Sequence, residues 1–142
     1  MPANGPDAKT LLEIYRRAKV AVQNDARVRA TIRSGRMATP YYPARGQEII
    51  PAAISVQLTD RDYVVTTYRG MHDQLIKGVP LKEFWAEYAG RATGSCKGKG
   101  GPMHITHPAS GVVVTTGIVG AGLPIGVGLA LASQLRGEDR IA

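Results

Sequence analysis

The sequence has a single cysteine, Cys96, among its 142 residues. One thiol excludes an internal disulfide framework and a zinc site built on several cysteines, and it favours a reducing compartment such as the cytoplasm. The first residues do not combine a basic start with an apolar run, so we expect no secretory signal. With 44% hydrophobic and 20% charged residues, the composition is that of a folded chain, and the length predicts one domain.

Acidic residues are missing between Glu87 and Glu138, a stretch that holds 12 of the 17 glycines. The only charged residues in this stretch are four cations, Arg91, Lys97, Lys99 and Arg136. The whole chain has a net charge of +7, which favours contact with phosphates, nucleic acid or acidic partners. An acid-free, glycine-rich and basic stretch predicts a backbone whose N–H groups can approach a phosphate closely.

Hydrophobic periodicity and turn residues predict a series of short elements. Helices are expected over residues 8–33, 46–58, 71–77, 80–88 and 123–136. A strong strand is expected over residues 63–68, and a short strand or turn over 115–119. Residues 1–7 are expected to be a flexible N-terminus, and residues 91–111 an irregular loop.

Apolar positions predict which faces of these helices are buried. In the first helix one face is formed by Leu11, Tyr15, Ala18 and Val22. In the second, the residues expected to be mostly buried are Ile49, Ile50, Ala53, Ile54 and Val56. The last helix has small residues, which predict close packing against a neighbouring backbone, at Gly122, Gly126, Ala130 and Ser133. Its length of about 14 residues, roughly 21 Å, is too short for a bilayer core of about 30 Å, so we expect no membrane span.

Common catalytic and metal signatures are absent. The glycines match neither a P-loop nor G-x-G-x-x-G, and three irregularly placed histidines, His72, His104 and His107, predict no metal site. Two features remain. Arg69 follows the strong strand at the end where open α/β sheets bind ligands, and the glycines of residues 117–122 let the backbone approach a flat or anionic ligand. A surface arginine in a turn and tight helix packing explain these features equally well.

Several short motifs follow one another in a specific order. They are Gly46-Gln47-Glu48, Thr67-Tyr68-Arg69-Gly70, Lys77-Gly78, Gly90-Arg91, the segment from Gly94 to His104, and Gly117-Ile118-Val119-Gly120-Ala121. This series resembles the α subunit of the thiamine-diphosphate-dependent 2-oxo acid dehydrogenases, the E1 group that includes pyruvate, branched-chain 2-oxo acid and acetoin dehydrogenases. The resemblance covers residues 8–142 and corresponds to the N-terminal portion of a usual α subunit.

The resemblance implies a fold, an activity and partners. The fold is α/β, a thiamine-diphosphate-binding fold with a parallel sheet flanked by helices, here incomplete at the C-terminus. The activity is oxidative decarboxylation of a 2-oxo acid with acyl transfer to a lipoyl-bearing E2, carried out by an α₂β₂ heterotetramer with an E1 β subunit. Carried over by position, the cofactor-binding residues are Tyr68, Arg69, Gly117 and Val119, and Tyr42 occupies a position expected to face the cofactor.

The sequence departs from the family pattern at three places. Tyr42 stands where pyruvate-type members have histidine, which is more similar to branched-chain members. Met71 stands where many members have histidine, and the adjacent His72 is the one candidate for a catalytic role. The Gly-Asp-Gly motif that binds Mg²⁺ would fall after Ala142. We therefore expect the Mg²⁺ ligands beyond the C-terminus of this sequence, no metal ligand within it, and no activity of the chain alone.

Two other classes of function are weighed against this one. The first is a non-catalytic module that pairs with other E1 polypeptides, which predicts an exposed apolar surface. The second is a basic nucleic-acid-binding domain, which the sequence does not favour because it has few aromatic residues and no recognised binding motif.

Overall fold

The computed structural model describes residues 5–142. Along the chain the elements are α1 (Ala8–Arg33), α2 (Ile49–Ser55), β1 (Val64–Thr67), α3 (Met71–Lys77), α4 (Leu81–Tyr88), the 3₁₀ turns η1 (Gly101–Met103) and η2 (Pro108–Ser110), β2 (Val112–Thr116) and α5 (Gly122–Leu135). The expected flexible N-terminus lies partly outside the described residues. Within them Asp7 caps α1, because its Oδ1 accepts a hydrogen bond of 2.7 Å from the Thr10 N–H.

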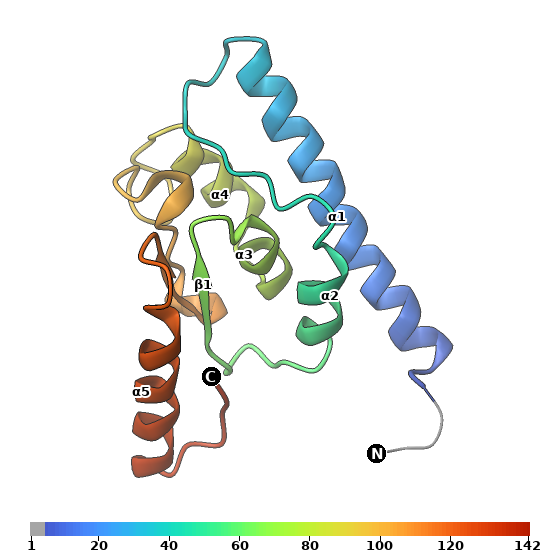
Figure 1. Cartoon of the computed structure of the whole chain (residues 1–142), viewed down its shortest axis with the longest axis vertical. Helices are drawn as coiled ribbons and strands as arrows, with labels where there is room; N and C mark the ends of the chain where they lie inside the picture. The colour runs from blue at the N-terminus through green and yellow to red at the C-terminus, as the bar shows by residue number, and fades with distance from the viewer. Residues whose placement is uncertain (1–4) are drawn as a thin grey trace.

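A two-stranded parallel sheet lies between helices. β1 and β2 pair in parallel, with Thr66 opposite Thr115 and Thr67 opposite Thr116. In Figure 1, β1 lies between α5 on one side and α3 on the other, and α2 and α1 follow beyond α3. The predicted α/β class with a parallel sheet flanked by helices is confirmed.

The second strand begins earlier than the sequence predicts. β2 covers Val112–Thr116 rather than residues 115–119, and all five of its side chains are β-branched, which favours a strand. The Val64 N–H donates to the Gly111 carbonyl at 2.8 Å, so pairing starts at the first residue of β2. On the other edge of β1, the Tyr63 N–H donates to the Ile141 carbonyl at 2.8 Å.

The main core is formed by α1, α3, α4 and the segment that leads into β2. Its largest buried side chains include Met71, Phe84, Ile105 and Val112. The predicted buried face of α1 is wrong except at Ala18, since Leu11 and Tyr15 are more than half exposed. The helix instead buries small and polar residues, Ala18, Ala21, Asn24, Asp25 and Val28. Small residues allow α1 to lie close to α2 and α3, and this packing turns the larger apolar side chains outward.

The predicted burial in α2 is also wrong, and the close packing predicted for α5 is found over only part of the helix. In α2 the three isoleucines, at positions 49, 50 and 54, are exposed, and the buried residues are Ala52 and Ser55. Of the small residues predicted to pack closely in α5, Ser133 is buried and a Cβ on Gly122 would lie 3.5 Å from Val65 Cγ1, whereas no atom lies within 4 Å of a Cβ built on Gly126. Both helices pack through one narrow stripe of small residues and leave their larger apolar side chains in solvent.

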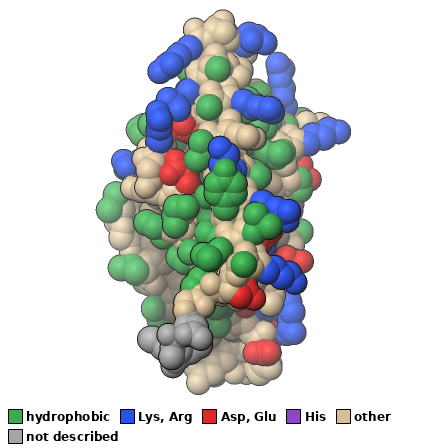
Figure 2. All heavy atoms as spheres, turned by 90° about the vertical axis from the view of Figure 1, so that its right-hand side faces the viewer, with side chains coloured by type: hydrophobic (Ala, Val, Ile, Leu, Met, Phe, Trp, Pro, Cys, Tyr) green, Lys and Arg blue, Asp and Glu red, His purple; other side chains and the backbone are tan. Residues whose placement is uncertain are grey.

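The α1 side of the molecule is correspondingly rich in exposed apolar groups. Figure 2 looks onto this side and shows hydrophobic side chains gathered over its middle and lower part, with Lys and Arg at the top and along the margins. Among the described residues, no helix combines the length and the hydropathy that crossing a bilayer requires.

Candidate functional site

The carboxyl ends of β1 and β2 bring the two remaining sequence features together. Because Thr67 lies opposite Thr116 in a parallel pair, Tyr68 and Arg69 leave the sheet at the same edge as Gly117. Chain segments that are almost 50 residues apart therefore meet where open parallel sheets bind their ligands. The local sequence patterns did not predict this strand pairing, although the family resemblance implied that both features contact one cofactor.

Tyr42, Tyr68 and Arg69 form one aromatic and cationic cluster at this edge. The Tyr42 and Tyr68 rings pack edge to face, with centroids 5.1 Å apart. Arg69 Nη2 donates to the Tyr68 hydroxyl at 3.0 Å, and the guanidinium lies 5.2 Å from the Tyr68 ring centre. Arg69 is exposed, and no acidic side chain in residues 5–142 forms an ion pair with it. Its remaining N–H donors are available to an anion.

The second part of the edge is the turn between β2 and α5. Val119 is 85% exposed, and the Ile118 N–H donates to Thr116 Oγ1 at 3.1 Å. α5 then begins at Gly122 without a hydrogen-bonding side-chain cap and without an acid in its first turn. Helix N-termini carry unpaired N–H groups and a partial positive charge. This edge of the sheet is therefore suited to a negatively charged ligand.

Gly117 lies against two side chains that directly follow the glycine-rich loop of residues 94–101. A Cβ built on Gly117 would lie 3.4 Å from both Met103 Cε and His104 Cε1. His104 Nδ1 is also 3.4 Å from the Thr115 carbonyl oxygen, so this ring lies along the end of β2. The position of the loop thus determines what surrounds the backbone of residue 117.

The glycine-rich loop is organised by a carboxylate from within the chain. Glu87 is fully buried. Its Oε2 accepts hydrogen bonds from the N–H groups of Cys96 at 2.8 Å and Gly98 at 2.9 Å, and its Oε1 accepts from Gly100 at 2.8 Å and Gly101 at 3.0 Å. Burial acts to raise the pKa of Glu87, but the four backbone hydrogen bonds outweigh it and hold the pKa below its usual range.

This arrangement corrects one expectation from the sequence. The N–H groups of the loop were expected to approach a phosphate, whereas four of them are already paired with Glu87. From the sequence, Glu87 was identified only as the boundary of the acid-free stretch. A signal was present, because Glu87 is the last acid before a loop that has many N–H groups and no acidic residue of its own.

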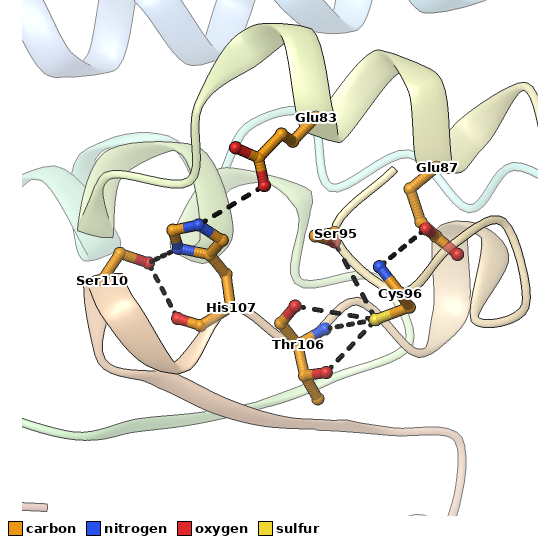
Figure 3. A network of polar contacts seen from close by, with 7 residues as sticks. All are labelled: Glu83, Glu87, Ser95, Cys96, Thr106, His107 and Ser110. Atoms are coloured by element: carbon orange, nitrogen blue, oxygen red, sulfur yellow. Dashed lines mark hydrogen bonds and ion pairs between the residues drawn. The ribbon is translucent and has the colours of Figure 1, made fainter. Parts of the chain in front are cut away.

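Neighbouring polar contacts connect the segment that follows the loop, residues 106–110, to the loop and to α4 (Figure 3). The Thr106 N–H donates to Cys96 Sγ at 3.1 Å. His107 Nδ1 lies 2.9 Å from Ser110 Oγ, and His107 Nε2 lies 3.5 Å from Glu83 Oε2. No group of three or more His, Cys, Asp or Glu side chains among residues 5–142 is placed to bind a metal ion.

His72 lies beside Arg69 but inside the protein. Both line a pocket of about 240 Å³ together with Gln47, Thr67 and Asp73. The His72 ring is buried, and neither ring nitrogen has a hydrogen-bond partner among the described residues. Burial lowers the pKa of His72, while the carboxylates of Glu48, Asp25 and Asp73 act in the opposite direction. His72 can therefore contact a ligand that enters this pocket.

Replacing His72 with leucine is expected to stabilise the fold by about 1–2 kcal/mol at pH 7, because it removes two buried polar atoms without partners. The difference in free energy of unfolding between the variant and the wild type should increase as the pH falls. In the unfolded wild-type chain His72 takes up a proton below about pH 6.5, the ordinary pKa of histidine, whereas in the folded chain it does so only at lower pH. Acid therefore favours the unfolded state of the wild type and not that of the variant. Urea unfolding of both proteins between pH 5 and 8 measures this. A loss of stability in the variant at pH 7 would show that the ring nitrogens do have partners.

Comparison with known proteins identifies the family. A family model described as dehydrogenase E1 component matches residues 15–142. The chain is 33% identical over 135 residues to the α subunit of acetoin:2,6-dichlorophenolindophenol oxidoreductase from Cupriavidus necator, which covers 95% of this chain and 40% of that protein. It is 34% identical over 130 residues to the mitochondrial pyruvate dehydrogenase E1 α subunit of Saccharomyces cerevisiae, covering 92% of this chain and 30% of that protein.

The chain belongs to the dehydrogenase E1 component family. A shorter match to the corresponding mitochondrial subunit of Kluyveromyces lactis reaches 44% identity over 94 residues, which is 66% of this chain and 22% of that protein. The chain therefore spans less than half the length of the curated relatives it matches.

Proposed function

We propose that residues 8–142 form the N-terminal part of a thiamine-diphosphate-binding E1 α domain and contribute the diphosphate side of the cofactor site. The observation that supports this most is the strand register. Pairing of Thr67 with Thr116 brings Tyr68, Arg69 and the backbone of residues 117–119 to one edge, and these are the positions at which the family resemblance puts the cofactor.

The donor set at this edge fits a diphosphate. Arg69 supplies an exposed guanidinium, Tyr68 a hydroxyl, and the uncapped start of α5 a partial positive charge. The backbone at Gly117 can lie close to the middle of the cofactor because it carries no side chain, and Val119 and Tyr42 border the same edge. Bound thiamine diphosphate would supply the carbanion chemistry that decarboxylates a 2-oxo acid. His72, behind Arg69 in the shared pocket, is our candidate for a further role there.

The described residues do not fit the metal. Mg²⁺ prefers six oxygen ligands, and residues 5–142 contain no suitable cluster. We propose that its ligands come from polypeptide outside this sequence and that the chain alone holds the cofactor only weakly and is inactive. The full activity would require an E1 β subunit, with transfer of the acyl group to a lipoyl-bearing E2, in the cytoplasm.

A second candidate function is pairing with other E1 polypeptides without a catalytic contribution. The exposed apolar side chains of α1 and α5 favour such contacts. Examples are Leu11 and Tyr15, at 52% and 58% exposed, and Leu123 and Leu135, at 78% and 79% exposed. The two candidates differ in whether the chain contributes to catalysis, so a test of catalysis separates them.

The test is a chimera in which residues 1–142 replace the matching part of the Bacillus subtilis acetoin:2,6-dichlorophenolindophenol oxidoreductase α subunit. This relative is 38% identical over 97 residues, which is 68% of this chain. The chimera is produced with that enzyme's other subunit. We expect reduction of 2,6-dichlorophenolindophenol that depends on thiamine diphosphate and on acetoin or a 2-oxo acid. The isolated chain should give none. A folded, fully assembled chimera without cofactor-dependent turnover would contradict the catalytic proposal and leave pairing as the function.

A further inference from the structure

The carboxylate of Glu87 accepts backbone hydrogen bonds that the loop of residues 94–101 would otherwise make to water. It is fully buried on the last turn of α4 and has no cationic partner among residues 5–142. Its two oxygens accept four backbone hydrogen bonds of 2.8–3.0 Å from residues 96–101. A buried charge is costly unless it is paired or fully hydrogen-bonded. The loop therefore has a strong reason to close around this one side chain.

The loop is also too tight to adopt a different path easily. A Cβ on Gly94 would lie 2.6 Å from Glu87 Cα, one on Gly98 would lie 2.6 Å from the Gly90 carbonyl carbon, and one on Gly100 would lie 2.6 Å from the His104 carbonyl oxygen. Three close backbone approaches and four hydrogen bonds specify a single loop conformation. They also fix the point at which the chain leaves the loop, at Met103 and His104.

Met103 and His104 connect the loop to the edge of the sheet where β1 and β2 end. Their side chains are the two nearest groups to a Cβ built on Gly117, each at 3.4 Å, and the His104 ring is also 3.4 Å from the Thr115 carbonyl. The sequence of contacts is Glu87, the loop N–H groups, His104, and then the backbone of residue 117.

We propose that Glu87 is a positioning residue for the cofactor edge. It does not touch the cofactor, and it holds the 94–101 loop so that Met103 and His104 close against Gly117. The cofactor part of this inference rests on the proposed function, whereas the link from Glu87 to residue 117 is a property of the chain without ligand.

The test compares Glu87→Gln with Glu83→Gln in the full chain by nuclear magnetic resonance. Glutamine has nearly the same shape, but its NH₂ group faces two N–H donors and cannot accept from them. Glu83 lies one turn earlier on α4, and its carboxylate has a single 3.5 Å contact with His107, so it serves as the matched control. In Glu87→Gln we expect amide exchange at residues 96, 98, 100 and 101 to become about tenfold faster or more, with loss of the proton contact between His104 and Gly117. Glu83→Gln should retain both.

A wild-type titration keeps the inference testable if Glu87→Gln does not fold. The four loop amides should shift together, with a common midpoint below about 4.3, the ordinary glutamate pKa, and the Gly117 amide should shift with them. A Gly117 amide shift whose midpoint differs from that of the four loop amides would contradict the proposed link between Glu87 and residue 117.

The role of Glu87 in the cofactor site is tested by measuring the amide shifts that millimolar thiamine diphosphate causes. We expect the shifts it causes at residues 117–119 to be lost in Glu87→Gln while those at Arg69 remain. If the His104–Gly117 contact persists in Glu87→Gln, the inference is overturned whatever the cofactor does. If the contact is lost but the response at 117–119 is unchanged, the positioning role is overturned. If the wild-type chain shows no response at either segment, the proposed function fails and with it the cofactor part, while the contact measurement still decides the role of Glu87 within the chain.

Discussion

Replacing Gly111 with alanine is expected to destabilise the fold by about 3–5 kcal/mol, enough to leave a small domain largely unfolded. The new Cβ would overlap the Asp62 carbonyl oxygen and lie 2.8 Å from Lys77 Nζ. Gly111 also has a φ of +78°, a conformation that L side chains rarely adopt. The closest clash is with backbone, so no change of rotamer relieves it.

The position matters because both strands begin there. The Gly111 carbonyl accepts the hydrogen bond from the Val64 N–H. The buried Lys77 donates to the carbonyls of Thr59 at 2.9 Å and Ser110 at 2.8 Å, which joins the turn before β1 to the turn before β2. Moving residue 111 away from residue 62 would therefore disturb the register that brings Arg69 and Gly117 to one edge.

Gly35→Ala is the matched control. Its φ is +73°, and no atom lies within 4 Å of the new Cβ, so only the left-handed conformation costs free energy, about 1–2 kcal/mol. Thermal or urea unfolding of the two variants measures the difference. Equal losses of stability in both would show that the close approach of Gly111 to Asp62 does not exist.

Replacing Arg69 with methionine is expected to weaken the binding of thiamine diphosphate in the assembled chimera by about 10- to 100-fold. The substitution removes a charge-assisted contact of about 1.5–3 kcal/mol and leaves the side-chain volume similar. Arg69 is exposed and has no acidic partner among the described residues, so the fold should be little affected. The measurement is the cofactor concentration that gives half-maximal reduction of 2,6-dichlorophenolindophenol.

Arg61→Met provides the comparison for this variant. Arg61 is exposed and precedes β1, whereas Arg69 follows it, so the two variants remove the same charge at opposite ends of one strand. We expect Arg61→Met to leave the half-maximal concentration unchanged. If both variants weaken cofactor binding equally, the effect comes from net charge and not from a site at the carboxyl edge.

Local sequence signals predicted much of the secondary structure. The long first helix ends at Arg33, before the left-handed Gly35, and the strand over residues 63–68 contains β1. The helix over 71–77 ends at Gly78, which is also left-handed. These features depend on caps, glycine conformations and β-branched runs, all of which act over a few residues.

Contacts between distant residues could not be predicted in the same way. The pairing of β1 with β2 depends on how the intervening helices pack, and the capture of four loop N–H groups by Glu87 depends on a loop path with no periodicity. The predicted buried face of α1 was wrong because hydrophobicity alone predicts that Leu11 is inside, whereas this fold packs the helix through small residues. The family resemblance, by contrast, proposed Tyr42, Tyr68 and Arg69 as site residues, and the structure brings all three into one cluster.

The central claim is that the edge where β1 and β2 end binds the diphosphate of the cofactor. The most direct measurement is a map of amide chemical shifts in the isotopically labelled chain during titration with thiamine diphosphate, compared with thiamine, which has no phosphate. We expect weak binding, with a dissociation constant of about 1 mM, and phosphate-dependent shifts at residues 68–69 and 117–120. Shifts at residues 61–63 and 111–112, at the opposite ends of the strands, or equal responses to thiamine and thiamine diphosphate would contradict it.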